Sequence, residues 1–119
     1  MSEAGARLDE ERRRTERRLA DLRAEYGGFV EASRDSNADD EHDPEGATIA
    51  FERSQVGALA REAEEHLREI YAAQARLAVG TYGGCASCGR PIPAARLEAR
   101  PTATTCVPCA TSAGGSRRG

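Results

Sequence analysis

Apolar residues recur at seven-residue intervals between Ala47 and Gly80, and arginine and glutamate occupy the outer positions. The members of this stripe are Ile49, Val56, Leu59, Ala63, Leu67, Ile70, Ala73 and Leu77. A heptad stripe sustained over four repeats is typical of a helix that packs along a partner helix in a coiled coil. The pattern therefore predicts a long helix that ends near Gly80.

The residues before this stripe carry the signals of a helix start. Asp43 is a suitable N-cap, and Pro44 is favoured at the first helical position. Glu45 places a negative charge near the positive end of the helix dipole. We therefore expect the helix to begin at this point.

A second heptad stripe precedes these residues, with members Leu8, Thr15, Leu19, Leu22, Tyr26 and Phe29. Gly27 and Gly28 interrupt it at a cost of roughly 1 kcal/mol each relative to alanine, so we expect a bend or a brief break there. Because only about a dozen residues join the two stripes, they predict an antiparallel hairpin. Each arm of about 33 residues would be about 50 Å long.

Composition agrees with an elongated helical protein. The 119 residues include five aromatic side chains, and 31% of the residues are charged, which leaves little bulk for a large globular core. The N-terminus lacks the apolar core of a signal peptide, and no apolar run approaches the length of a membrane span. The sequence therefore predicts a cytoplasmic protein with no membrane partner.

The net charge of −3 conceals an acidic segment at residues 35–45, which reads DSNADDEHDPE and contains no arginine. We expect this acidic segment at the tip of the hairpin. One interpretation is a solvated loop with a helix cap at Asp43. The other is a functional charge cluster for a divalent cation or a basic cleft in a partner, because Asp39, Asp40 and Glu41 would lie near the unfavourable C-terminal end of the first helix.

All four cysteines lie in two pairs, Cys85 with Cys88 and Cys106 with Cys109, that are separated by 17 residues. This C-x₂-C-x₁₇-C-x₂-C spacing is typical of a tetrahedral zinc site, and Gly89 suits the tight turn after the first pair. Two disulfides or a redox-active pair are the alternatives, and the absence of a signal peptide disfavours disulfides. Four protein ligands close a metal site, so we predict one structural zinc ion that takes no part in catalysis.

The segment from Tyr82 to Ala110, YGGCASCGRPIPAARLEARPTATTCVPCA, resembles the zinc-finger region of the DksA/TraR family of bacterial transcription regulators. The specific runs are Cys-Gly-x-Pro-Ile and Arg-Leu-Glu-Ala-Arg-Pro, and the predicted hairpin matches the family's coiled coil. The resemblance implies a non-enzymatic protein that binds RNA polymerase, inserts its coiled coil into the secondary channel and modulates initiation, often with guanosine tetraphosphate. The family's Asp-x-x-Asp-x-Ala tip pattern places Asp40 and Asp43 near the polymerase active site, with Glu45 in place of the alanine.

Two other functions stay open at this point. One is a transcript-cleavage-type polymerase factor, whose tip acids help to hold a catalytic magnesium ion. The other is a nucleic-acid-binding zinc ribbon with the hairpin as a spacer. Its candidate phosphate contacts are Arg90, Arg96, Arg100, Arg117 and Arg118. Tyr82 is the ribbon's one ring for base stacking and the chain is acidic, so we expect no direct sequence-specific DNA binding.

The predicted fold class is mainly α, with three parts. Residues 1–80 form a long antiparallel two-helix coiled-coil hairpin, residues 81–110 form a small C4 zinc finger, and residues 111–119 form a flexible tail. Within the finger, Arg-Leu-Glu-Ala-Arg-Pro predicts a short helix that ends at Pro101. We expect Leu97 of this helix to point inward, near Leu77 or Tyr82.

Overall fold

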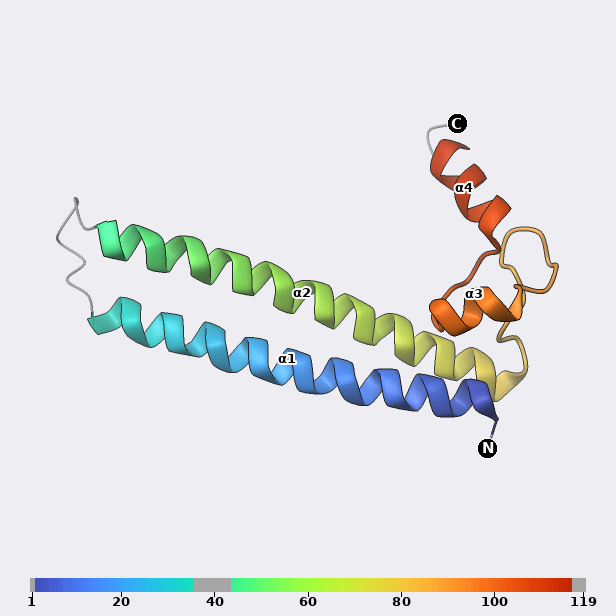
Figure 1. Cartoon of the computed structure of the whole chain (residues 1–119), viewed down its shortest axis with the longest axis horizontal. Helices are drawn as coiled ribbons and strands as arrows, with labels where there is room; N and C mark the ends of the chain where they lie inside the picture. The colour runs from blue at the N-terminus through green and yellow to red at the C-terminus, as the bar shows by residue number, and fades with distance from the viewer. Residues whose placement is uncertain (1, 36–43, 117–119) are drawn as a thin grey trace. The chain divides into compact units, whose positions relative to one another are not determined.

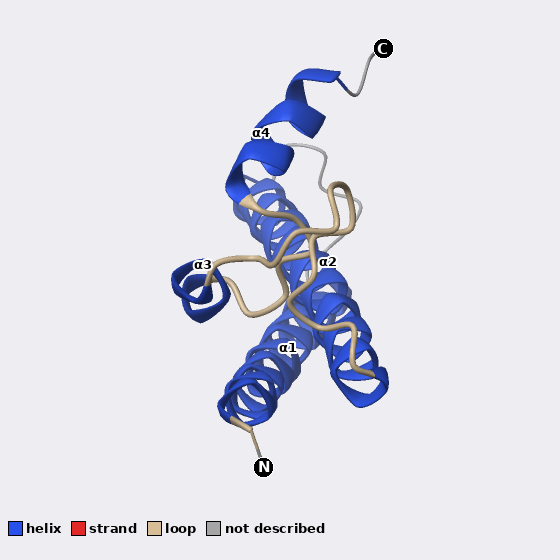
Figure 2. Cartoon of the chain, turned by 90° about the vertical axis from the view of Figure 1, so that its right-hand side faces the viewer, coloured by secondary structure: helices blue, strands red, loops and turns tan. Residues whose placement is uncertain are grey.

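A computed structural model of the chain describes residues 2–35 and 44–116 (Figure 1). Its helices are α1 (Glu3–Asp35), α2 (Pro44–Val79), α3 (Ala94–Ala99) and α4 (Val107–Ser116). Within these described ranges there is no strand, and Figure 2 accordingly shows helices and loops. The predicted mainly helical fold class, with a pair of long helices followed by a cysteine cluster, is confirmed.

The chain divides into two compact units. One unit is Arg13–Leu67, and the other combines Met1–Arg12 with Arg68–Gly119. The sequence placed a boundary after residue 80 instead, and that division stays a prediction. The sequence predicted a flexible tail at residues 111–119, whereas α4 is helical through Ser116.

In the unit Arg13–Leu67, α1 and α2 run antiparallel and side by side (Figures 1 and 2). Their shared core is the group of buried side chains Leu19, Leu22, Val56 and Ala63, with Phe29, Ala60 and Leu67 packed against it. Nearly all of these residues belong to the two heptad stripes. The stripes therefore predicted this seam, whereas two of their members, Leu59 and Tyr26, are 38% and 40% exposed.

Helix α1 continues through Gly27 and Gly28 without a break. Next to these two glycines, α1 packs against a third glycine, Gly57 of α2. A Cβ atom at Gly57 would lie 3.2 Å from the ring of Tyr26, so the missing side chain makes room for the tyrosine. Contacts with α2 therefore offset the poor helix propensity of the two glycines in α1.

A polar contact also joins the two helices of this unit. The Arg23 Nη2 atom lies 2.9 Å from the Glu64 Oε2 atom, and both side chains are substantially exposed. Exposed ion pairs of this kind contribute only about 0–1 kcal/mol. The apolar seam is therefore the main source of stability.

In the second unit, the first turns of α1 pack against the last turns of α2. Leu8 and Ile70 are fully buried there, and Ala73 is buried between the helices. The N-terminal end of α1 is capped by Ser2, whose Oγ atom accepts a hydrogen bond of 3.0 Å from the amide of Gly5. This cap was not predicted from the sequence.

Helix α2 ends where the sequence predicted, immediately before Gly80. Gly80 has a φ of +85°, which a residue without a Cβ adopts readily. Its amide donates to the carbonyl of Leu77, and the amide of Thr81 donates to the carbonyl of Arg76. These paired bonds form a Schellman motif and redirect the chain toward the cysteines.

No helix in the described part of the chain is both long and apolar enough to cross a membrane.

The seam makes a testable distinction between two leucines of the heptad stripes. Leu22→Ala should lower the free energy of unfolding by about 2–4 kcal/mol, because it removes a buried side chain from a narrow two-helix core. Leu59→Ala is the matched control and should cost less than about 1 kcal/mol. Urea unfolding followed by circular dichroism measures both, and equal losses would contradict the observed packing.

Candidate metal centre

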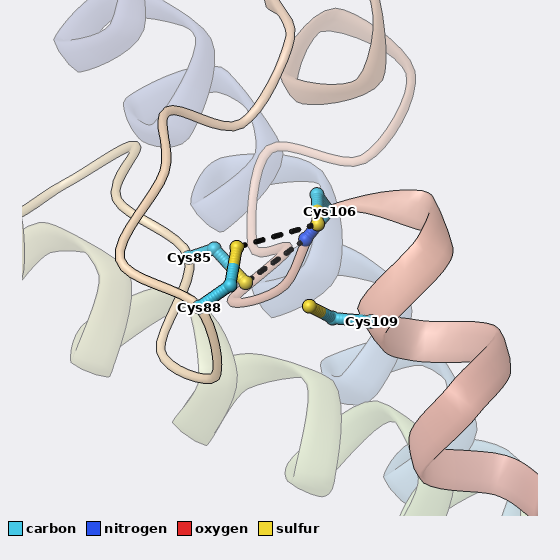
Figure 3. A group of neighbouring side chains, drawn as sticks. All are labelled: Cys85, Cys88, Cys106 and Cys109. Carbon is cyan, nitrogen blue, oxygen red and sulfur yellow. Dashed lines mark hydrogen bonds between the residues drawn. The ribbon is translucent and has the colours of Figure 1, made fainter.

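The four cysteines come from two separated segments and converge in space (Figure 3). Cys85 and Cys88 lie in the loop after α2, Cys106 directly precedes α4, and Cys109 lies in the first turn of α4. Their Sγ atoms all lie within 4.8 Å of one another. The Sγ atoms of Cys88 and Cys106 are 3.9 Å apart. A tetrahedral zinc site with Zn–S bonds of about 2.3 Å places its sulfurs about 3.8 Å apart, so this arrangement fits zinc.

The first pair of cysteines sits on a tight turn. The amide of Gly89 donates to the carbonyl of Cys85 over 2.9 Å, and Gly89 has a φ of +77°. The amide of Cys85 in turn donates to the carbonyl of Arg90 over 2.8 Å. Glycine is favoured at this left-handed position because a Cβ atom would be strained there. This turn aims the thiols of Cys85 and Cys88 in one direction.

Hydrogen bonds join the segments that carry the two cysteine pairs. The amide of Cys106 donates to the Sγ atom of Cys85 over 3.4 Å. Nearby, the amide of Ala86 donates to the carbonyl of Thr104 over 2.8 Å. Helix α4 begins immediately after Cys106, and the amide of Ala110 donates to the carbonyl of Cys106. The start of α4 therefore holds Cys109 toward the same centre.

The thiols of Cys85 and Cys109 differ in pKa. The hydrogen bond from the Cys106 amide is the main cause that lowers the pKa of Cys85 to about 6. Hydrogen bonds with the other three thiols raise the pKa of Cys109 to about 12, with the contact to Cys106 the largest cause. Four thiols this close therefore resist ionising together. A divalent cation among them removes this opposition, because coordinated thiols lose their protons.

Helix α3 lies between the cysteine pairs and confirms the predicted short helix. The amide of Arg100 donates to the carbonyl of Arg96 over 2.7 Å, and Pro101 prevents further helix. Leu97 is half-buried, and its Cδ1 atom lies 3.6 Å from the place of a Cβ atom on Gly83. Leu97 therefore lies beside Gly83. Its expected packing near Leu77 or Tyr82 stays a prediction.

Tyr82 makes a hydrogen bond within the finger. Its hydroxyl donates a hydrogen bond of 2.7 Å to the carbonyl of Pro101. Burial raises the pKa of Tyr82, while the positive charges of Arg7 and Arg76 oppose the rise. The phenol therefore stays protonated at neutral pH and can donate this bond.

A basic cavity of about 330 Å³ lies beside α3. Its lining includes three arginines, one acid and several small residues: Arg76, Arg96, Arg100, Glu69, Ala72, residues 102–105 and Ala110. The Nη2 atom of Arg76 is buried and has no hydrogen-bond partner among the described residues. Sequence reasoning named Arg96 and Arg100 only as phosphate contacts and missed Arg76, because no local motif connects residues so far apart in the chain.

The predicted tip residues Asp40 and Asp43 lie outside the described residues. Helix α1 ends at Asp35 and α2 begins at Pro44, so the acidic segment connects the two helices in sequence. The role of these two aspartates therefore stays a prediction.

The comparisons with known proteins agree with this architecture. Residues 80–113 match the prokaryotic dksA/traR C4-type zinc finger. The solved structure of transcription factor DksA2 from Pseudomonas aeruginosa is similar over 96% of this chain and 88% of that chain, with a TM-score of 0.62 and 30% sequence identity. YteA of Bacillus subtilis (strain 168) is 45% identical over 69 residues, and this match spans 58% of the chain but only 29% of YteA.

A helical hairpin joined to a four-cysteine finger is the architecture of a zinc-finger transcription regulator. The chain belongs to the DksA/TraR family. Its cofactor is the one structural zinc ion of a C4 finger.

Replacing one cysteine tests the metal centre directly. Cys88→Ser should lower the zinc content from one ion per chain toward zero, because three thiolates and a neutral hydroxyl hold zinc far less tightly than four thiolates. Ser87→Ala, in the same turn, is the control and should keep one ion per chain. Native mass spectrometry gives the stoichiometry, and a fully loaded, folded Cys88→Ser protein would contradict the site.

Proposed function

We propose that this protein binds RNA polymerase and regulates transcription initiation by placing its acidic segment in the secondary channel. The observation that carries the proposal is the likeness to DksA2, which extends over nearly the whole chain and includes both the helical pair and the finger. Two long helices that flank an acidic segment suit insertion into a narrow channel. Such a role would place the protein in the cytoplasm.

In this proposal the metal has a structural role. Cys85, Cys88, Cys106 and Cys109 bind one zinc ion, and four protein ligands leave no open position for a substrate or an activated water. The site therefore supports a regulator and not an enzyme. The finger supplies a stable surface for polymerase, while the regulatory effect comes from the acidic segment.

The acidic segment contains six carboxylates and no compensating arginine. Such a concentration of like charge is attracted to a magnesium ion or to basic residues in a partner's channel. We assign the effect on initiation to Asp40 and Asp43, which occupy the family's two aspartate positions. Glu45 replaces the family's alanine and adds a further negative charge beside them.

We also propose that guanosine tetraphosphate, bound together with polymerase, contacts the basic cavity beside α3. Guanidinium groups of Arg76, Arg96 and Arg100 can bind phosphate oxygens through paired hydrogen bonds. Arg76 also contributes a positive charge to the cavity wall. The carboxylate of Glu69 opposes a polyanion and should weaken its binding.

The cavity gives a charge-based prediction. Arg100→Ala should weaken guanosine tetraphosphate binding to the protein–polymerase complex about tenfold to hundredfold, because it removes a charge-assisted hydrogen bond. Arg90→Ala is the control, since this exposed arginine is not among the residues that line the cavity. Glu69→Gln should tighten binding. Equal affinities for all variants in a nucleotide-binding assay would exclude this cavity.

The acidic segment is tested by the double substitution Asp40→Asn with Asp43→Asn. Affinity for polymerase should stay within about threefold, because the helices and the finger make most of the contacts. The effect on initiation should largely disappear with the two charges. Asparagine caps a helix about as well as aspartate, so the start of α2 should be unaffected.

The matched control for this test is Asp39→Asn with Glu41→Gln, which removes the same number of charges from the same segment. It should retain most of the regulatory effect. If both double variants regulate initiation as well as the parent, the segment is a solvated loop and the proposed mechanism is wrong. Transcript cleavage by the parent on stalled complexes would instead favour the cleavage-factor alternative.

A further inference from the structure

The start of α2 carries an uncharged face that points away from α1. We define the Phe51 face as Ala47, Phe51, Ser54 and Ala58, whose spacing places them on one side of the helix. At 100° per residue this side lies roughly opposite the seam residues Val56 and Ala60. Phe51 is 63% exposed, whereas the chain's other phenylalanine, Phe29, packs against the core.

The charge distribution along α2 makes this face distinct. Residues 46–60 carry two charged side chains, Glu52 and Arg53, and neither lies on the Phe51 face. Residues 61–69 carry six charged side chains. An isolated exposed apolar residue is ordinary on a protein surface, but here an aromatic ring lies on a locally uncharged face beside the acidic segment in sequence.

The size of the face indicates what kind of surface covers it. Its exposed ring and small neighbours would bury roughly 300 Å² in a contact, whereas a stable complex buries about 800 Å² on each partner. Two copies of the chain paired through this face alone would therefore be too weakly held. The face has the size of one part of a larger interface, with an aromatic anchor at its centre.

We propose that the Phe51 face docks against an apolar patch on RNA polymerase and sets how long the complex lasts. This inference rests on the proposed polymerase-binding function. The charges of the acidic segment accelerate encounter and act on initiation, whereas burial of an apolar ring acts mainly on the dissociation rate. Docking and regulatory effect would then be carried by different residues of the same hairpin.

The experiment measures binding of purified RNA polymerase to the immobilised full-length, zinc-loaded protein. Phe51→Ala should weaken affinity about tenfold to hundredfold, chiefly through faster dissociation, and Phe51→Leu should restore most of it. Gln55→Ala, at an exposed and uncharged neighbouring position, is the matched control and should bind like the parent. The melting temperature should not change, because Phe51 lies outside the core. At saturating concentration, Phe51→Ala should still regulate initiation.

Each other outcome has a separate meaning. If the parent binds polymerase and Phe51→Ala binds equally well, the docking surface is wrong while the proposed function stands. If the parent does not bind polymerase, the proposed function fails and this inference fails with it. If sedimentation shows a parent dimer that Phe51→Ala abolishes, a second copy covers the face and the polymerase assignment is overturned.

Discussion

Convergence of four thiols on a single cation is the interaction on which the C-terminal module depends. The buried residues between Tyr82 and Ala110 are Cys85, Ile92 and Ala103, which is too little apolar surface to fold this loop-rich segment unaided. The bonds from Cys106 to Cys85 and from Ala86 to Thr104 form only when the two cysteine pairs meet. Zinc coordination therefore supplies folding free energy for the module, and the placement of α3 and of the basic cavity follows from it.

The paired helices obey a different constraint. In the unit Arg13–Leu67 their stability comes from a narrow apolar seam, in which Ala63 is buried and Gly57 leaves room for the ring of Tyr26. This packing needs no metal. One chain thus combines a helical pair stabilised by burial with a finger stabilised by coordination. In the proposed function the helical pair presents the acidic segment and the Phe51 face, and the finger presents the basic cavity.

The features that were predicted from the sequence are those set by residues close together in the chain. A period of seven marked Leu22, Val56 and Ile70 as buried, because residues at heptad spacing lie on one side of a helix and can face its partner. The spacing of the cysteines predicted the metal cluster, because each C-x₂-C pair forms a local turn that can present two thiols to one ion. The fit of Tyr26 against Gly57 and the basic cavity were missed, because they depend on residues that only the folded chain brings together. The roles of Asp40 and Asp43 stay predictions, since both lie outside the described residues.

The central claim is that zinc coordination folds the finger, whereas burial stabilises the helical pair. Its most direct test is amide hydrogen exchange of the native protein before and after zinc is removed by a chelator. We expect the amides of Cys85, Ala86 and Ile92 to lose at least about hundredfold protection without zinc. The bond of Ala86 joins the two cysteine segments, and the bonds of Cys85 and Ile92 lie in the turn that zinc holds in place. Amides of α1 and α2 within residues 13–32 and 46–67 should keep their protection. Retained protection at Ala86 and Ile92 in the zinc-free protein would contradict the claim that coordination folds the module.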